Sequence, residues 1–107
     1  MRNYRTFDEW KDEYFREHPE ELDGFITTIF EEYANDGDIG AFLASLRTVS
    51  RVKGITAIAD EAGLTRNGIQ KALSEQGHPK FESINAILHA IGYSLMPKRM
   101  GTNDSLC

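Results

Sequence analysis

The chain has 107 residues, enough for one small domain with an appended segment, and 40% of them are hydrophobic, enough for a small core. No apolar run is long enough to span a membrane, and the charged residues 1–20 argue against a secretory signal. The single cysteine is Cys107, which excludes an internal disulfide framework and a cysteine-based zinc site. We therefore expect a protein of the reducing cytoplasm.

The net charge of −5 argues against a simple nucleic-acid binder, but its distribution changes this interpretation. Residues 1–40 hold four basic and twelve acidic side chains, a net charge of −8. Residues 41–107 hold eight basic and five acidic side chains, a net charge of +3. Because phosphate attraction depends on the local field, the second part can still bind nucleic acid. The acidic part suggests a basic protein partner.

Two helices are predicted before residue 37. Thr6 and Glu9 fit a capping box, which predicts a helix that stops before Pro19. A second helix is predicted from about Pro19 to Ala34, because its apolar residues recur at helical spacing. Gly37 is then expected at its C-terminus, and Asp38 is expected to cap the next helix.

Four further helices are predicted downstream. Their expected ranges are Ile39–Lys53, Thr56–Ala62, Thr65–Leu73 and Phe81–Ile91, with Ile39 and Phe81 on buried faces. Arg47 and Arg51 lie four residues apart and are expected to share an exposed face. Residues 93–96 alternate like a short strand, and residues 98–107 are expected to form a disordered tail.

The stretch TAIADEAGLTRNGIQKALS at residues 56–74 has the spacing of a DNA-binding helix-turn-helix. Ala59 is small enough to let the two helices approach, and Gly63 suits a tight turn at positive φ. With Ile69 and Leu73 facing inward, the second helix presents a polar face to a major groove.

Residues suited to DNA contact occur on that face and beside it. Arg66 suits guanine, while Asn67 or Gln70 suits adenine. Phosphate contacts are expected from the remaining polar residues and from backbone N–H groups at helix starts, namely Arg47, Arg51, Lys53, Thr56, Thr65, Lys71 and Ser74.

The alternative is that these side chains form only a solvated helix face. Gly68 also argues against a strong helix, because an interior glycine costs about 1 kcal/mol relative to alanine. Close approach of a DNA backbone, of a neighbouring helix, or simple tolerance would each explain this glycine.

Residues 37–96 resemble the HigA-like addiction-module antidote family, a branch of the λ-repressor-like, Xre-type helix-turn-helix proteins. The resemblance rests on the stretches GDIGAFLASLRTVSRVKGIT, IADEAGLTRNGIQKALSEQGHPKFESI and NAILHAIGYSL. It implies an all-α, λ-repressor-like helix-turn-helix bundle, here with two extra N-terminal helices and the short strand-like segment. Ala57 and Gln70 depart from the family's frequent glutamine and aromatic residues, which bears on base contacts rather than on the fold.

The resemblance also implies a function and partners. The expected protein is an antitoxin that binds a basic RelE/HigB-like toxin and represses its own operon as a homodimer on a double-stranded DNA operator. A stand-alone prophage-type repressor, or an interaction module that uses the helix-turn-helix as a scaffold, remain alternatives. The predicted organisation is an acidic aromatic helical arm at 1–36, a DNA-binding domain at 37–97 and the tail.

Two protein-binding surfaces are candidates. The acidic, aromatic first helix suits a basic toxin, with Phe7, Trp10, Tyr14 and Phe15 as contacts. The alternative is that these aromatics are core, as helical aromatic stripes usually are. A dimer interface is expected at Ile91, Tyr93, Leu95 and Met96, unless this segment folds onto its own core.

Catalysis, cofactors and metal binding are not expected. The three histidines lie on different elements and show no ligand spacing. Residues 35–38 lack the further ligands of a calcium loop. No nucleophile–base pair and no phosphate-cradling glycine loop is present.

Overall fold

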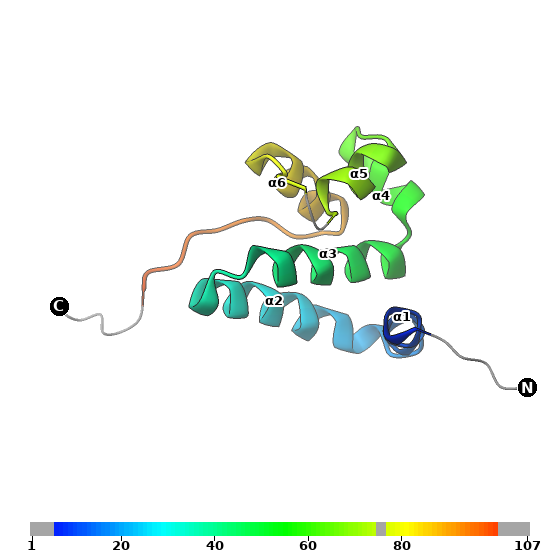
Figure 1. Cartoon of the computed structure of the whole chain (residues 1–107), viewed down its shortest axis with the longest axis horizontal. Helices are drawn as coiled ribbons and strands as arrows, with labels where there is room; N and C mark the ends of the chain where they lie inside the picture. The colour runs from blue at the N-terminus through cyan, green and yellow to red at the C-terminus, as the bar shows by residue number, and fades with distance from the viewer. Residues whose placement is uncertain (1–5, 75–76, 101–107) are drawn as a thin grey trace, which may run out of the picture.

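The computed structural model describes residues 6–74 and 77–100, and within these ranges it contains helices and no strand. The elements are α1 (Phe7–Glu17), the 3-10 turn η1 (Pro19–Glu21), α2 (Leu22–Asp36), α3 (Ile39–Lys53), α4 (Ile55–Ala62), α5 (Arg66–Ala72) and α6 (Phe81–Ala90). Figure 1 shows α2 lying along one side of α3, with α1 across its end and α4 to α6 on the opposite side. The predicted all-α class is confirmed for the described residues, and α3 is the central helix.

The first helix begins and ends as its sequence predicts. The Thr6 hydroxyl accepts a hydrogen bond from the Glu9 amide at 3.0 Å, and the Glu9 carboxylate accepts one from the Thr6 amide at 3.1 Å. This reciprocal pair confirms the capping box. Pro19 opens a single 3-10 turn, so α2 starts at Leu22 rather than at the proline.

Gly37 and Asp38 form the junction between α2 and α3. Gly37 adopts a left-handed φ of 66° and ends α2, and the Asp38 carboxylate accepts a hydrogen bond from the Ala41 amide at 3.1 Å. Both caps were predicted from the sequence, and α3 has the predicted bounds. The chain therefore turns back sharply enough for α3 to pack along α2.

One hydrophobic core runs through all six α-helices. Its most buried members come from both sides of α3 and are Phe15, Leu22, Ile26, Ile29, Phe42, Leu43, Leu46, Val49, Ile58, Ala59, Ile69, Leu73, Ile87, Leu88 and Ile91. Residues 12–36 thus share a core with the residues after them.

Two apolar residues predicted to face inward do not. Ile39 is 49% exposed and Phe81 is 73% exposed. Each is the first residue of its helix, and side chains there tilt toward the helix N-terminus, beyond the packed part of the neighbouring helices.

The prediction of a strand-like segment at residues 93–96 is wrong. The Tyr93 amide donates to the Leu88 carbonyl at 2.8 Å, and the segment then runs as irregular chain whose side chains line a groove with α2, a helix that offers no extended backbone to pair with it. Tyr93 and Leu95 pack partly against the core, whereas Met96 is 77% exposed. Residues 98–100 are exposed and irregular, and the rest of the predicted disordered tail lies outside the described residues.

A hydrogen bond ties this segment to α2. The Tyr93 hydroxyl donates to the Asp23 carboxylate, and this bond, together with burial and the carboxylate charge, raises the pKa of Tyr93 to about 12. No helix among the described residues is both long and apolar enough to cross a membrane.

We expect Gly77→Ala and Gly24→Ala to change stability in opposite directions. A Cβ atom at Gly77 would lie 2.5 Å from the Ala72 carbonyl oxygen and 2.6 Å from that of Lys71, so the loop must move away from α5. The free energy of unfolding should fall by about 1–3 kcal/mol. Gly24 has nothing within 4 Å of its added Cβ, so its substitution should raise stability by up to about 1 kcal/mol. Urea denaturation measures both, and equal midpoints would contradict the close approach.

We expect Tyr93→Phe to remove the last tyrosine to ionise. Because the folded pKa lies above the ordinary value of 10, the hydrogen bond stabilises the fold fully below pH 10, and this contribution is lost as pH rises toward 12. Ultraviolet titration of the phenolates should show a step near pH 12 in the native chain that the variant lacks, while the raised step of Tyr14 remains in both. Circular dichroism at each pH shows that the chain is still folded, and an unchanged titration curve would refute the Asp23 bond.

Candidate nucleic-acid interface

Helices α4 and α5 are joined by a turn centred on Gly63. This glycine has a left-handed φ of 73°, and both its amide and that of Leu64 donate to the Ala59 carbonyl. Thr65 then caps α5, because its hydroxyl accepts a hydrogen bond from the Gly68 amide at 2.8 Å. The glycine turn and the Thr65 cap are confirmed, which fixes α5 across the end of α4.

The inner side of this pair is apolar and closely packed. Ile58 and Ala59 of α4 are 2% and 3% exposed, and Ile69 and Leu73 at α5 are each 1% exposed. All four side chains belong to the one core cluster that these helices share with α3. Since these residues anchor α5, its opposite face is held outward.

That outward face carries the polar side chains selected from the sequence. Five of them are exposed, namely Thr65, Arg66, Asn67, Gln70 and Lys71. Thr56 and Lys53 are also exposed, on α4 and at the end of α3. Ser74 is half-buried, and its hydroxyl donates to the Lys71 carbonyl at 2.9 Å, so it serves the end of α5.

Gly68 has a local explanation. A Cβ atom there would lie 3.0 Å from the Thr65 hydroxyl oxygen, the atom that accepts the Gly68 amide. The glycine therefore leaves room for the cap of its own helix. Neither DNA nor a neighbouring helix is needed to account for it.

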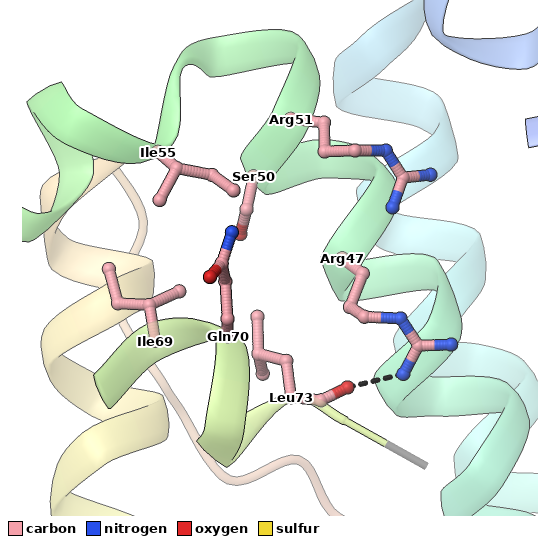
Figure 2. A pocket seen from close by; sticks show the side chains of 7 residues that line it. All are labelled: Arg47, Ser50, Arg51, Ile55, Ile69, Gln70 and Leu73. Atoms are coloured by element: carbon pink, nitrogen blue, oxygen red, sulfur yellow. Dashed lines mark hydrogen bonds between the residues drawn. The ribbon is translucent and has the colours of Figure 1, made fainter. Parts of the chain in front are cut away.

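The prediction that Arg47 and Arg51 share an exposed face is wrong, because both are half-buried. The Arg47 guanidinium donates to the Leu73 carbonyl at the end of α5, as Figure 2 shows. The Arg51 guanidinium instead reaches α1, where its Nε donates to the Asp12 carboxylate at 2.7 Å. Sequence spacing placed the two residues together, but neighbours on opposite sides of α3 draw their side chains apart.

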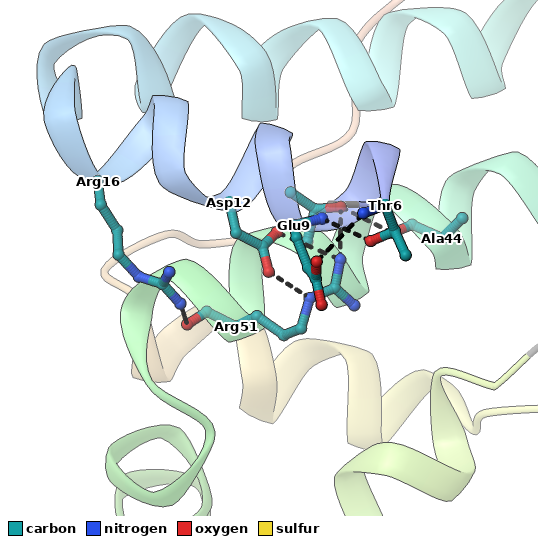
Figure 3. Close-up of polar contacts among 7 residues, drawn as sticks. Thr6, Glu9, Asp12, Arg16, Ala44 and Arg51 are labelled. Atoms are coloured by element: carbon teal, nitrogen blue, oxygen red, sulfur yellow. Dashed lines mark hydrogen bonds and ion pairs between the residues drawn. The ribbon is translucent and has the colours of Figure 1, made fainter. Parts of the chain in front are cut away.

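Figure 3 shows how α1 is fixed at this end of α3. Besides the Asp12 pair, Arg51 donates to the Thr48 hydroxyl at 3.3 Å, and Arg16 donates to the Arg51 carbonyl at 3.3 Å. Asp12 is only 6% exposed, so its charge depends on this pairing. The network joins the acidic first helix to Arg51, which lies three residues before Gly54 at the turn into α4.

A hollow of about 150 Å³ opens between α3, α4 and α5. Figure 2 shows Gln70 extending across it toward Ser50, with Ile55 and Ile69 on one side and the two arginines on the other. Gln70 is thus exposed, yet it lies over the seam between the helices. Arg66 and Asn67, one turn earlier on α5, do not line this hollow.

Two exposed residues, His78 and Lys80, were not selected from the sequence and lie on the side of α5 away from Gln70. His78 and Lys80 are exposed and line a second, wide hollow of about 610 Å³ together with Lys71. The signal was present in Lys80, which directly precedes the start of α6. The loop carries them there because Gly77 packs against the end of α5.

The candidate protein-binding residues divide between surface and core. Phe15 is 8% exposed and belongs to the core, so it is not available as a toxin contact, whereas Phe7 and Trp10 are 69% and 53% exposed. Ile91 is also buried, at 9%, in its own chain. A groove of about 500 Å³ beside α2 is lined by Tyr93, Leu95 and Met96 among others.

One group of possible metal ligands occurs within the described ranges. Atoms of His18, Glu20 and Glu21 lie within 4.8 Å of one another in an exposed turn, closer than sequence spacing suggested. Each has a partner already: His18 faces Glu20 at 3.7 Å, and Glu21 accepts the Tyr14 hydroxyl at 2.8 Å. These contacts account for the group without a metal.

Comparison with known proteins adds a family to this geometry. A family model described as a probable addiction module antidote protein matches residues 12–98, which is most of the chain. The chain belongs to this antidote family. An uncharacterized protein of Haemophilus influenzae is 31% identical over 72 residues, covering 67% of this chain and 70% of that protein. No solved structure matches the chain.

Family membership identifies the chain as an antidote and therefore implies a toxin partner in general. The matched region begins in α1, upstream of residue 37 where the sequence resemblance began. It thus includes α2 and most of the helix that pairs with Arg51. The family match accordingly covers α2 and residues 12–17 of α1 as well as the helices after residue 37.

We expect Asp12→Asn to destabilise the antidote by about 1–3 kcal/mol. The change leaves the Arg51 charge without its carboxylate, and the cost stays below that of a fully buried pair because the Arg51 side chain is 30% exposed. Glu20→Gln is the control, because that carboxylate is exposed and its loss should change stability by no more than about 0.5 kcal/mol. Equal urea midpoints for the two variants would refute a structural role for the pair.

Proposed function

We propose that this antidote is a HigA-like, Xre-type DNA-binding antitoxin that neutralises a RelE/HigB-like toxin and represses its own operon. The observation that carries the DNA-binding part is the two-sided character of α5. Ile69 and Leu73 are buried, while Arg66, Asn67 and Lys71 are exposed on the opposite face. A helix held in this way suits insertion into a major groove, where arginine and asparagine read base edges.

Charge supports the same proposal. Residues 41–107 carry a net charge of +3, and Lys53, Lys71 and Lys80 lie exposed at α3, at α5 and before α6. Such lysines suit phosphates, which orient a protein on DNA without reading its sequence. Arg47 and Arg51 contribute less in this proposal, because their guanidinium groups are engaged within the chain.

A homodimer on a palindromic operator is part of the proposal. Leu95 and Met96 lie along the apolar groove beside α2, where a twofold partner would cover them. Ile91 and Tyr93 support this segment from within their own chain, through the core and through Asp23. The interface is therefore proposed at Leu95 and Met96 rather than at all four residues.

An electrophoretic mobility shift on DNA from immediately upstream of the gene tests the DNA-binding role. Unrelated DNA serves as competitor, and two salt concentrations are compared. A specific, salt-sensitive shift supports an autoregulatory repressor. Absence of a specific shift well above micromolar protein, with and without the product of the adjacent reading frame, would leave α5 as a scaffold. A specific shift without any toxin-like neighbouring frame would favour a stand-alone repressor.

We expect Arg66→Ala and Lys71→Ala to weaken DNA binding in different ways. Loss of a base-reading arginine should cost about 1–3 kcal/mol on the specific operator and little on random DNA. Loss of a phosphate-contacting lysine should weaken both and reduce the log–log salt slope by about 1. Both side chains are exposed, so the fold should be unaffected. Equal losses of Arg66→Ala on both DNAs would refute base reading by Arg66.

A further inference from the structure

The exposed side of α1 carries a continuous row of rings. Phe7 and Trp10 stack with ring centroids 6.2 Å apart, and Trp10 and Tyr14 stack at 6.0 Å with planes 21° apart. His18 continues the row, 4.4 Å from Tyr14. Tyr14 is half-buried and packs partly against the core beside Phe15, whereas Phe7 and Trp10 are 69% and 53% exposed. Internal packing therefore explains Tyr14 in part but does not explain the exposed rings of Phe7 and Trp10.

One ring of this row already has a cation beside it. The Lys11 ammonium lies 5.1 Å from the Phe7 ring centroid and 5.9 Å from that of Phe25, within the range of a cation–π interaction. A cation of the same chain, Lys11, therefore already occupies the Phe7 end of the row of rings. The Trp10 and Tyr14 rings lie farther along the same side and carry no such contact with Lys11.

An open hollow lies beside those two rings. It is lined by Trp10, Tyr14, Glu13 and Glu17, and its volume is about 190 Å³. Tyr14 is held in place because its hydroxyl donates to Glu21, and this bond raises its pKa above the usual value. Two aromatic rings and two carboxylates thus line one open hollow on the surface of α1.

We propose that this hollow receives a lysine or arginine side chain of a basic protein partner. The rings supply the cation–π face and the Glu17 carboxylate supplies the counter-charge, so both parts of the lining favour the same kind of group. The net charge of −8 over residues 1–40 repels nucleic acid and attracts a basic protein. Tryptophan and tyrosine are also the residues that most often dominate binding energy at protein interfaces. The inference rests on the proposed function in one respect, which is that the basic partner is the toxin.

Removing residues 1–36 would not test this site cleanly. That segment supplies Phe15, Leu22, Ile26 and Ile29 to the core, so its loss would uncover core residues of the later helices and confuse a loss of binding with a loss of stability. Point substitutions in the full chain avoid the problem. Trp10 is the only tryptophan, so its fluorescence reports the occupancy of the hollow directly.

The probe is a helical peptide with two arginines one turn apart, compared with the same peptide carrying citrulline, a neutral isostere. The arginine peptide should shift Trp10 emission in a saturable way and bind about tenfold more tightly than the citrulline peptide. Glu17→Gln should weaken binding about three- to tenfold. Glu31→Gln, an exposed glutamate of α2 with the same charge change, should leave it unaltered.

Calorimetry extends the test to Trp10→Leu, which should weaken the arginine peptide about tenfold while circular dichroism stays unchanged. Equal binding of both peptides, equal effects of Glu17→Gln and Glu31→Gln, unchanged binding by Trp10→Leu, or no saturable binding would each overturn the proposal. So would a dimer in sedimentation that Trp10→Leu dissociates, since the occupant would then be a second copy.

The protein encoded beside the gene separates this inference from the proposed function. If that protein binds the native chain and binds the Trp10→Leu and Glu17→Gln variants equally well, the antitoxin role is supported. The proposal that the hollow receives a basic side chain is then refuted. If the peptide results are as expected but neither that protein nor upstream DNA binds, binding of a basic side chain in the hollow is supported and the proposed function is refuted.

Discussion

The structure depends on the burial of α3 from opposite sides. Leu46 and Val49 are fully buried, and even the polar Thr48 and Ser50 are no more than 2% exposed. A helix of 15 residues can be covered this way only if every polar group on it finds a partner. Arg47 and Arg51 meet this requirement in opposite directions, one at the end of α5 and the other at Asp12 of α1.

This arrangement shows which parts of the fold local chemistry determines. The capping box at Thr6, the left-handed glycines at 37 and 63, and the Asp38 and Thr65 caps are interactions within a few residues, so the sequence predicts them well. Periodicity likewise predicted that Ile69 and Leu73 are buried and that Arg66 and Asn67 are exposed. These features define α5 and most of its polar face.

What the sequence could not predict depends on residues far apart in the chain. The Arg51–Asp12 pair spans 39 positions and the Arg47–Leu73 contact spans 26, so helical spacing alone made both arginines look exposed. The same limit applies to the aromatic residues of α1. Helical periodicity could not separate buried Phe15 from exposed Trp10, because that division depends on where α2 and α3 lie.

Two surfaces of opposite charge thus share one core. The acidic, aromatic helix α1 and the helix α5 lie on different sides of α3. Arg51 joins α1 to α3, and Arg47 joins the end of α5 to α3. A partner that binds either surface of the folded chain stabilises the whole core by mass action. That linkage alone does not make the two sites cooperative, because coupling requires a second arrangement that one partner favours over the other. The polar links through α3 are where such an arrangement would have to differ, since α1 cannot shift without breaking the contacts of Arg51, which lies three residues before the turn into α4.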